Sequence, residues 1–161
     1  MLIIIEGADK TGKTTLAKEI AERYGYRYHH FGPPGPNPAE EYAEFLINLK
    51  EPVVCDRFFY GEMVYGPLLR GKSLMTTKQI NMIEEMCLAH NAYLIHAEPK
   101  LDIINNRMHE LGDDMITVEQ NEKAYGMFNT VISKAILPKL KYDSAKPMEE
   151  FLKYLEEKYW L

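Results

Sequence analysis

The sequence predicts an α/β protein in which one parallel sheet of five strands lies between two layers of helices. Two observations predict this three-layer α/β/α fold. Short apolar runs alternate along the chain with longer segments whose apolar residues recur at helical spacing. The length of 161 residues also matches one domain with a core of ordinary size. In such sheets, ligands bind at the carboxyl ends of the strands.

The N-terminal segment predicts a strand, a glycine-containing loop and a helix in succession. The run Leu-Ile-Ile-Ile at 2–5 suits a strand that is buried on both faces. A helix is expected at 15–24, because Leu16, Ile20 and Tyr24 fall on one helical face. The loop between this strand and this helix therefore lies at the carboxyl end of the strand.

The next part of the chain predicts two more strands around one helix. Aromatic residues at 26–31 alternate with others and indicate a second strand, and the prolines and glycines at 32–38 indicate a loop. A helix is expected at 39–50, followed by a short buried strand at 53–55 that ends at Asp56. The apolar face of this helix comprises Tyr42, Phe45, Leu46 and Leu49.

The second half of the chain continues the alternation. The predicted elements are a helix at 76–90, a strand at 92–97, a helix at 101–110, a helix from 117 to about 137, a weak strand at 140–143 and a last helix that begins at 147. Thr117 and Gln120 have the spacing of a capping box, which marks the start of the helix from 117 to about 137. Pro147 suits the first position of a helix.

The loop at 7–14 carries the strongest functional signal. Its sequence, Gly-Ala-Asp-Lys-Thr-Gly-Lys-Thr, fits the phosphate-binding pattern G-x-x-x-x-G-K-[ST]. Gly7 and Gly12 allow the backbone to turn tightly and to bring its amides to phosphate oxygens. The N-terminus of the following helix adds partial positive charge. The strand before and the helix after are the context that supports a nucleotide triphosphate site.

Four residues at two strand ends are expected to carry the chemistry. Lys13 would bridge the β- and γ-phosphates of ATP, and the Thr14 hydroxyl would bind Mg²⁺. Asp56 could hold Mg²⁺ through water, or could accept a proton from an attacking hydroxyl. Arg57 offers a planar fork that suits a phosphate. Because both strands end at the same edge of the sheet, these residues are expected to form one site.

Composition excludes several classes of protein. Apolar residues make up 46% of the chain and charged residues 27%, and no apolar run approaches the roughly 20 residues that span a bilayer. No secretion signal is recognisable, and Cys55 and Cys87 are expected to be buried thiols without metal spacing, so a cytoplasmic location is expected. The net charge of −5 argues against broad affinity for nucleic acid, although local basic patches can oppose the sum.

Three stretches of the sequence resemble one family. Residues 5–15 are similar to the opening of thymidylate kinases, 54–59 to their Asp-Arg-aromatic motif, and 143–150 to the late segment that lies against adenine. The order and rough spacing agree over most of the chain. The protein is therefore identified as a small, phage-like member of the thymidylate kinase and deoxynucleoside kinase group of P-loop kinases. This resemblance implies a single P-loop kinase domain over 1–161, a strand order of 2-3-1-4-5, and possible homodimers through the helices at 76–90 and 118–137.

The resemblance also implies an ATP site. Residues expected to contact the nucleotide are Gly7, Asp9, Lys10, Thr11, Gly12, Lys13, Thr14, Thr15 and Ala145. A lid is expected at about 107–117, where the family often has two or more basic residues. This chain has Arg107 but Leu111 ahead of Gly112, so one lid cation is absent. Lys10 stands where one class of thymidylate kinases has a P-loop arginine, and it would supply the missing charge.

The acceptor side departs further from the family. By resemblance, Asp9 would contact the sugar hydroxyl of the acceptor and Arg57 would hold its phosphate, with Phe58 beside them. The segment between the P-loop and Asp56 is shorter than in cellular thymidylate kinases. Tyr42 or Phe45 could stack on a base. Arg70 and Lys72 could serve the phosphate or base of the acceptor, or could belong to a solvated loop. The thymine specificity of thymidylate kinases therefore does not carry over to this protein by resemblance.

These observations favour a nucleotide kinase that moves the γ-phosphoryl group of MgATP to a deoxynucleoside monophosphate such as dTMP. One alternative is a kinase with a hydroxyl acceptor, either a deoxynucleoside or a hydroxymethylated base in DNA. Another is a nucleotide-binding switch that transfers no phosphate. The base-reading motif Asn-Lys-x-Asp of GTPases is absent from the sequence.

Overall fold

The computed structural model describes residues 1–112 and 115–159, and it contains one sheet of parallel strands in the order β2-β3-β1-β4-β5. The predicted fold class and strand order are therefore confirmed. The strands are β1 (Leu2–Glu6), β2 (Arg27–His30), β3 (Val53–Asp56), β4 (Ala92–Ala97) and β5 (Lys139–Tyr142). Of the predicted lid at 107–117, Asp113 and Asp114 lie outside the described residues.

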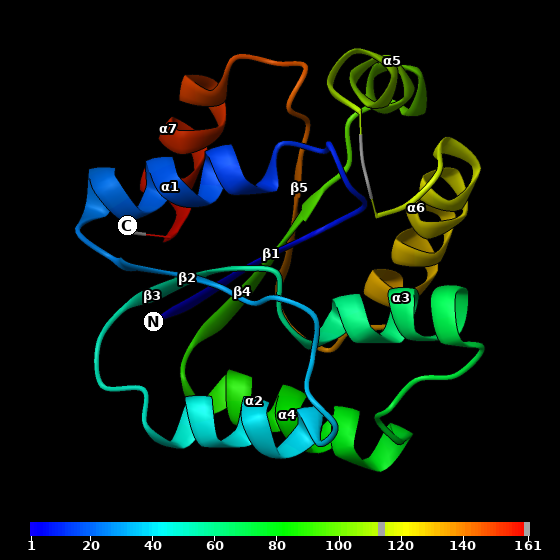
Figure 1. The fold of residues 1–161 in the computed structure, drawn as a ribbon. Coiled ribbons are helices and arrows are strands. Elements are labelled where there is room, and N and C mark those ends of the chain that lie inside the picture. The colour runs from blue at the N-terminus through cyan, green and yellow to red at the C-terminus, as the bar shows by residue number, and fades with distance from the viewer. Residues whose placement is uncertain (113–114, 160–161) are drawn as a thin grey trace.

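Helices cover both faces of this sheet. They are α1 (Lys13–Tyr24), α2 (Pro38–Ile47), α3 (Phe59–Arg70), α4 (Thr77–Ala89), α5 (Leu101–Leu111), α6 (Val118–Ser133) and α7 (Met148–Tyr159). Helices α1 and α7 lie on one face and α2 and α4 on the other, with α3 and α6 side by side (Figure 1). None of the helices in the described ranges is long and apolar enough to cross a membrane.

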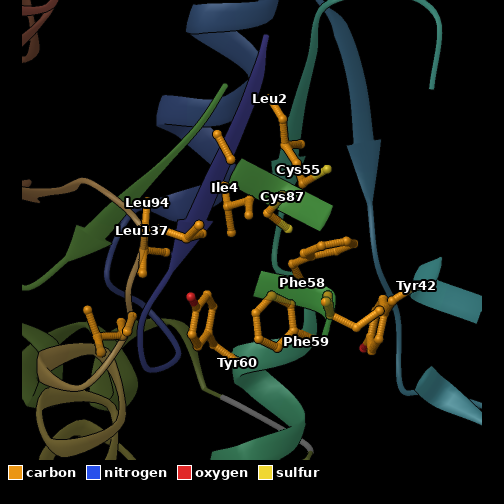
Figure 2. Packing of buried hydrophobic residues seen from close by; sticks show 14 of the residues in the cluster. Leu2, Ile4, Tyr42, Cys55, Phe58, Phe59, Tyr60, Cys87, Leu94 and Leu137 are labelled. Carbon is orange, nitrogen blue, oxygen red and sulfur yellow. The ribbon is translucent and has the colours of Figure 1, made fainter. Parts of the chain in front are cut away.

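The side chains of β1 divide between two hydrophobic cores. Leu2 and Ile4 face the core under α2, α3, α4 and α6, whereas Ile3 and Ile5 face the core under α1 and α7. Burying one such side chain contributes about 1.5–3 kcal/mol. Figure 2 shows Leu2 and Ile4 in the first core, above the aromatic rings that begin α3. The strand is therefore anchored on both faces, and its carboxyl end holds the P-loop in a fixed position.

Helix α3 has no counterpart among the predicted elements. Its sequence contains Gly61, Gly66 and Pro67, all of which disfavour helix interiors. Tertiary packing overrides this local preference, because Phe59 and Tyr60 are almost completely buried in the first core. The chain between β3 and β4 therefore forms two helices.

The predicted end of the helix from 117 to about 137 is wrong, although the capping box at its start is confirmed. Helix α6 ends at Ser133, and the next residues form a turn and an irregular connection to β5. Leu137 is buried in the core there, and the Ile136 amide donates to Glu84 Oε1 at 3.1 Å. Burying Leu137 and forming the hydrogen bond to Glu84 stabilise the protein more than another turn of helix would.

Candidate active site

The P-loop conformation depends on its two glycines. Gly7 has φ of 150°, and a Cβ there would lie 2.5 Å from the Ala97 carbonyl oxygen on β4. Gly12 has φ of 90°, and a Cβ there would lie 2.9 Å from Ser144 Cβ. Both positions combine a backbone that favours glycine with a close neighbour. The loop is thus packed between β4 and the segment after β5, and α1 begins directly behind it at Lys13.

Lys13 lies inside this loop. Its side chain is 5% exposed, and its ammonium donates to the Ala8 carbonyl and, at 3.4 Å, to Thr11 Oγ1. Burial lowers the pKa of Lys13 to about 8, although the Asp9 carboxylate 4.0 Å away favours the charged form. The side chain is therefore mainly protonated at neutral pH. A phosphate entering the loop would replace the present acceptors.

Asp56 ends β3 as a buried carboxylate with three partners on one oxygen. Oδ2 accepts from Thr14 Oγ1 at 2.6 Å and from the Tyr28 hydroxyl at 3.0 Å, and His30 Nδ1 lies 3.0 Å from it. Burial alone would raise the pKa of Asp56, but these hydrogen bonds outweigh it, and the pKa lies below its ordinary value. Asp56 is therefore ionised at neutral pH.

Asp56 and Thr14 together supply two oxygen atoms of the kind that Mg²⁺ binds. Asp56 Oδ1 is buried and has no hydrogen-bond partner among the described residues. The Thr14 hydroxyl beside it adds a second hard oxygen. Within 1–112 and 115–159, no group of three or more His, Cys, Asp and Glu residues could hold a metal. Mg²⁺ commonly takes only one or two protein oxygens and fills its shell with water and phosphate oxygens, so this pair fits it.

A second cluster joins the P-loop to β3 and α6. Arg57, with φ of 69°, donates from Nη2 to Asp9 Oδ1 at 2.6 Å. The Asn121 side chain on α6 accepts from the Asp9 amide at 2.9 Å and donates to the Asp9 carbonyl at 3.0 Å. Asn121 is fully buried, so its amide group has no access to water. It therefore fixes the backbone of Asp9, and Asp9 in turn orients Arg57.

Replacing Asn121 with alanine should release this clamp. Loss of two hydrogen bonds in a buried setting is expected to lower the free energy of unfolding by about 1–3 kcal/mol. Misplacement of Asp9 and Arg57 should also lower kcat/KM for phosphotransfer by about tenfold or more. Chemical denaturation and steady-state kinetics measure the two effects. The control is Asn129→Ala, two turns along the same helix, which should leave kcat/KM unchanged; equal losses in both variants would contradict the assigned role.

Glu6 is a buried carboxylate at the end of β1, beside the segment that carries Arg57. Its Oε1 accepts from the amides of Phe58 at 2.7 Å and Gly61 at 3.1 Å, which are at the N-terminus of α3. Its Oε2 is buried without a hydrogen-bond partner among the described residues. Burial raises the pKa of Glu6 to about 7, against the opposing hydrogen bonds from Phe58 and Gly61 and the charge of Lys13.

This raised pKa predicts a pH-dependent stability. Between pH 4.5 and 7 the unfolded chain loses the Glu6 proton while the folded protein keeps it, so the contribution of Glu6 to stability falls as pH rises. In Glu6→Gln this loss is absent. The free energy of unfolding of Glu6→Gln, relative to wild type, should therefore increase by about 3 kcal/mol from pH 4.5 to above pH 7. Denaturant titrations across this range test it, with the exposed Glu22→Gln as a control that should follow wild type.

Two cavities meet at Asp9 and Arg57. The first has a volume of about 470 Å³ and the second about 240 Å³. The first is lined by Asp9, Lys10, Thr11, Gly12, Lys13, Thr14, Thr15, Arg57, Arg107, Leu111, Tyr142, Ser144 and Met148. The second is mainly aromatic and apolar and is lined by Asp9, Phe31, Gly32, Pro33, Pro34, Tyr42, Arg57, Phe58, Gly61, Glu62, Tyr65, Leu69, Arg70, Met115 and Ile116. We refer to these as the P-loop cavity and the aromatic cavity.

The structure brings most of the predicted site residues to these cavities. The expected lid arginine, Arg107, donates to the Lys10 carbonyl at 3.0 Å and to Ser144 Oγ at 2.7 Å, so it fastens the P-loop to the segment after β5. Four residues line neither cavity. Asp56 is completely buried and reaches the P-loop cavity only through Thr14, whose hydroxyl donates to it. Gly7 is buried at the start of the loop, and Ala145 is exposed beside Ser144; neither residue lines the P-loop cavity. Phe45 packs against Phe31 and lines a different surface hollow, because it points from α2 away from the aromatic cavity.

Sequence reasoning missed four residues that complete the site. Tyr28 and His30 were recognisable only as part of a strand, although their spacing of two places both on one face of β2. Asn121 looks like an ordinary helix residue, and its burial next to the P-loop is a long-range effect. Tyr65 lines the aromatic cavity with a buried hydroxyl that has no hydrogen-bond partner among the described residues. No local signal distinguishes it from a core tyrosine.

The fold and these cavities define a class: the described chain has a P-loop nucleoside kinase-like fold. Its sequence is 26% identical over 151 residues to the SPbeta prophage-derived uncharacterized protein YorR of Bacillus subtilis (strain 168), covering 90% of each chain. The crystal structure of YorR, in complex with phosphorylated GDP, matches with a TM-score of 0.81, 23% identity and 98% of each chain covered. A prophage-derived relative fits the phage-like character expected from the sequence.

More distant structures share the architecture. Deoxyadenosine kinase from M. mycoides with bound dATP matches with a TM-score of 0.65 at 16% identity over 98% of each chain. The same enzyme with dCMP and a flexible dCDP bound also gives 0.65 at 16% identity, covering 98% of this chain and 97% of that one. No family model matches the sequence. The likeness supports deoxynucleoside kinase architecture, whereas the specific resemblance to thymidylate kinases stays a prediction.

Proposed function

We propose that this protein is a nucleotide kinase that transfers the γ-phosphoryl group of ATP to a deoxynucleoside monophosphate. The observation that carries the proposal is the junction of the two cavities. Asp9 and Arg57 line both, so a donor on the P-loop and an acceptor in the aromatic cavity would meet at this pair. A guanidinium at that point suits the phosphate of the acceptor.

The donor would occupy the P-loop cavity. Backbone amides of the loop and the start of α1 would bind the phosphates, and Lys13 would lie between the β- and γ-phosphates. Lys10 and Arg107, which both line the cavity, would add positive charge around the transferred group. Ser144 and Met148 line the same cavity from the segment that resembles an adenine-contacting motif.

Asp56 and Thr14 would hold Mg²⁺. Bound there, the ion would neutralise charge on the phosphates of the donor. The protein's contribution is to keep both oxygen ligands in place: Tyr28 and His30 fix the Asp56 carboxylate, and the start of α1 fixes Thr14. The lowered pKa keeps Asp56 ionised over the neutral range.

The transfer itself needs no covalent enzyme intermediate. An oxygen of the acceptor phosphate attacks the γ-phosphorus, the bond from that phosphorus to the bridging oxygen breaks, and ADP leaves with the electron pair. A phosphate acceptor that is already ionised has no proton to lose. Arg57, held by Asp9, would orient this acceptor and partly neutralise it.

A second acceptor class, the hydroxyl of a deoxynucleoside, is favoured by the same Asp9. A hydroxyl must lose its proton during attack, and a carboxylate at the junction could accept it. The deoxyadenosine kinases that share the fold add support for this acceptor class. Asp9 would then act as the base, and its hydrogen bond from Arg57 would orient the carboxylate.

An acceptor screen tests both proposals. ATP labelled in the γ-phosphate is incubated with the protein and, separately, with the deoxynucleoside monophosphates, the deoxynucleosides and hydroxymethylated DNA. Guanine nucleotides belong in the panel because YorR was crystallised with one. Label on a monophosphate supports the first proposal. Label only on a nucleoside or on DNA overturns it in favour of a hydroxyl acceptor, and hydrolysis without transfer to any acceptor overturns both.

A further inference from the structure

Lys10 occupies a backbone conformation that lysine rarely adopts. Its φ is 63°, in the left-handed region where the Cβ of an L-residue is crowded. Such outliers persist only where the surrounding structure holds them, and they gather at functional sites. Lys10 also lines the P-loop cavity, so the strained residue places a cation at the proposed donor site. Because this cation would act on the transferred group, the assignment of its role rests on the proposed function.

Two side chains from outside the loop hold the peptide groups on either side of the Lys10 Cα. Asn121 Nδ2 on α6 donates to the Asp9 carbonyl at 3.0 Å, which belongs to the peptide group before Lys10. Arg107 Nη1 on α5 donates to the Lys10 carbonyl at 3.0 Å, which belongs to the peptide group after it. The φ and ψ angles of a residue describe the relative orientation of these two planes. Holding both planes therefore holds Lys10 in its left-handed conformation.

The two anchoring side chains are themselves fixed. Asn121 is fully buried. The Arg107 guanidinium also donates from Nη1 to Ser144 Oγ at 2.7 Å and from Nη2 to the Ser144 carbonyl at 3.3 Å, so it lies in one plane against the segment after β5. Helices α5 and α6, which carry the anchors, lie beside one another (Figure 1) and are joined by a hydrogen bond of 2.7 Å from Asn105 Nδ2 to Glu122 Oε1. The packing of these two helices therefore sets the distance between the anchors.

We propose that Arg107 is a positioning residue, which holds the backbone of Lys10 so that the Lys10 ammonium faces the transferred phosphoryl group. If the Lys10 carbonyl were released, φ could return to negative values, and this rotation about the N–Cα bond would turn the side chain away from its present direction. A cation displaced from the transition state loses most of its effect. Glycine adopts positive φ freely and would need no anchor, but it would carry no charge. Arg107 therefore acts through Lys10.

A double-mutant cycle between Arg107 and Lys10 tests this coupling. Arg107→Met keeps an unbranched apolar side chain but removes the donors, and it should lower kcat for phosphotransfer by about tenfold or more. In the Lys10→Gly background no cation is left to position, so the same substitution should lower kcat by less than about threefold. In the Lys10→Arg background the cation is kept, and the loss should again be about tenfold or more. Asn106→Ala, an exposed neighbour on α5 that lines neither cavity, is the control and should leave kcat unchanged in every background.

Equilibrium binding gives a second measurement that needs no turnover. Wild type, Arg107→Met, Lys10→Gly and the double variant are titrated calorimetrically with the non-hydrolysable ATP analogue AMP-PNP. Arg107→Met should weaken binding about threefold to tenfold in the wild-type background and less than about twofold in Lys10→Gly. Thermal unfolding verifies that each variant folds. Should Arg107→Met alone fail to fold, the double variant is expected to fold, because glycine adopts the left-handed conformation without an anchor.

The outcomes separate the two proposals. Equal losses of kcat from Arg107→Met in the wild-type and Lys10→Gly backgrounds would show that Arg107 acts independently of Lys10, and would overturn the positioning role while leaving the kinase proposal intact. A double variant that fails to fold would also overturn the positioning role. Coupling in the affinity for AMP-PNP without phosphotransfer to any acceptor would overturn the kinase proposal and support the positioning role. A protein that binds no AMP-PNP and transfers no phosphate would overturn both.

Discussion

Replacing Lys13 with alanine is expected to lower kcat for phosphotransfer by about 10³-fold or more, because a single cation aimed at the transferred phosphoryl group contributes that much. The ammonium is buried within the P-loop and bonded to the Ala8 carbonyl and Thr11. Its lowered pKa shows that the fold gains little from keeping it charged. The variant should therefore fold, and a normal circular dichroism spectrum with lost transfer is the expected pair of results.

Lys18→Ala is the matched control for this experiment. Lys18 is an exposed lysine on the same helix and does not line the P-loop cavity. It should retain the kcat of wild type. Turnover in Lys13→Ala within tenfold of wild type would remove the P-loop from the mechanism, and with it the proposed function. Equal losses in both variants would point to damage of α1 instead.

The variant Asp56→Asn should lower kcat by about 10²-fold or more and raise the Mg²⁺ concentration needed for half-maximal rate. The reason is the environment of the carboxylate, which is buried, ionised and surrounded by the donors of Thr14, Tyr28 and His30. Asparagine keeps the shape but loses the charge. If its amide nitrogen faces those donors, the free energy of unfolding should also fall by about 1–3 kcal/mol.

A magnesium titration distinguishes the metal role from a role in proton transfer. Loss of a metal ligand shifts the Mg²⁺ dependence, whereas loss of a general base lowers kcat at every Mg²⁺ concentration and removes an acidic limb from the pH profile. His30→Gln is the control, because His30 contacts the same oxygen but is 46% exposed, whereas Asp56 is buried. It should change kcat less than tenfold. An unchanged Mg²⁺ requirement in Asp56→Asn would contradict the proposed ligand.

Local patterns predicted the three central strands, β3, β1 and β4, because these strands are buried on both faces. Burial requires continuous apolar runs such as 2–5 and 53–55, and these are visible in any window of a few residues. Helix α3 could not be predicted in this way. Its glycines and proline argue against a helix, and the aromatic packing that overrides them involves strands elsewhere in the chain.

The same distinction applies to the site. The P-loop, Thr14 and the Asp56–Arg57 pair could be identified because each follows directly from a strand end or a short motif. The position of Phe45 could not, since Tyr42 and Phe45 belong to the same predicted helical face, yet only Tyr42 lines the aromatic cavity. Helical periodicity identifies a buried face without identifying what it is buried against.

The amino-acid sequence by itself determined the order of the strands and of every helix except α3, the phosphate-binding loop and the acidic strand end beside it. It could do so because hydrophobic periodicity and glycine chemistry act over a few neighbouring residues. Only the tertiary structure decided that Asn121, 112 positions along the chain from Asp9, clamps Asp9, and that Glu62 pairs with Arg70 in the wall of the aromatic cavity. Contacts of this kind arise when distant segments are packed together, and their energies depend on a burial that no local pattern of residues records.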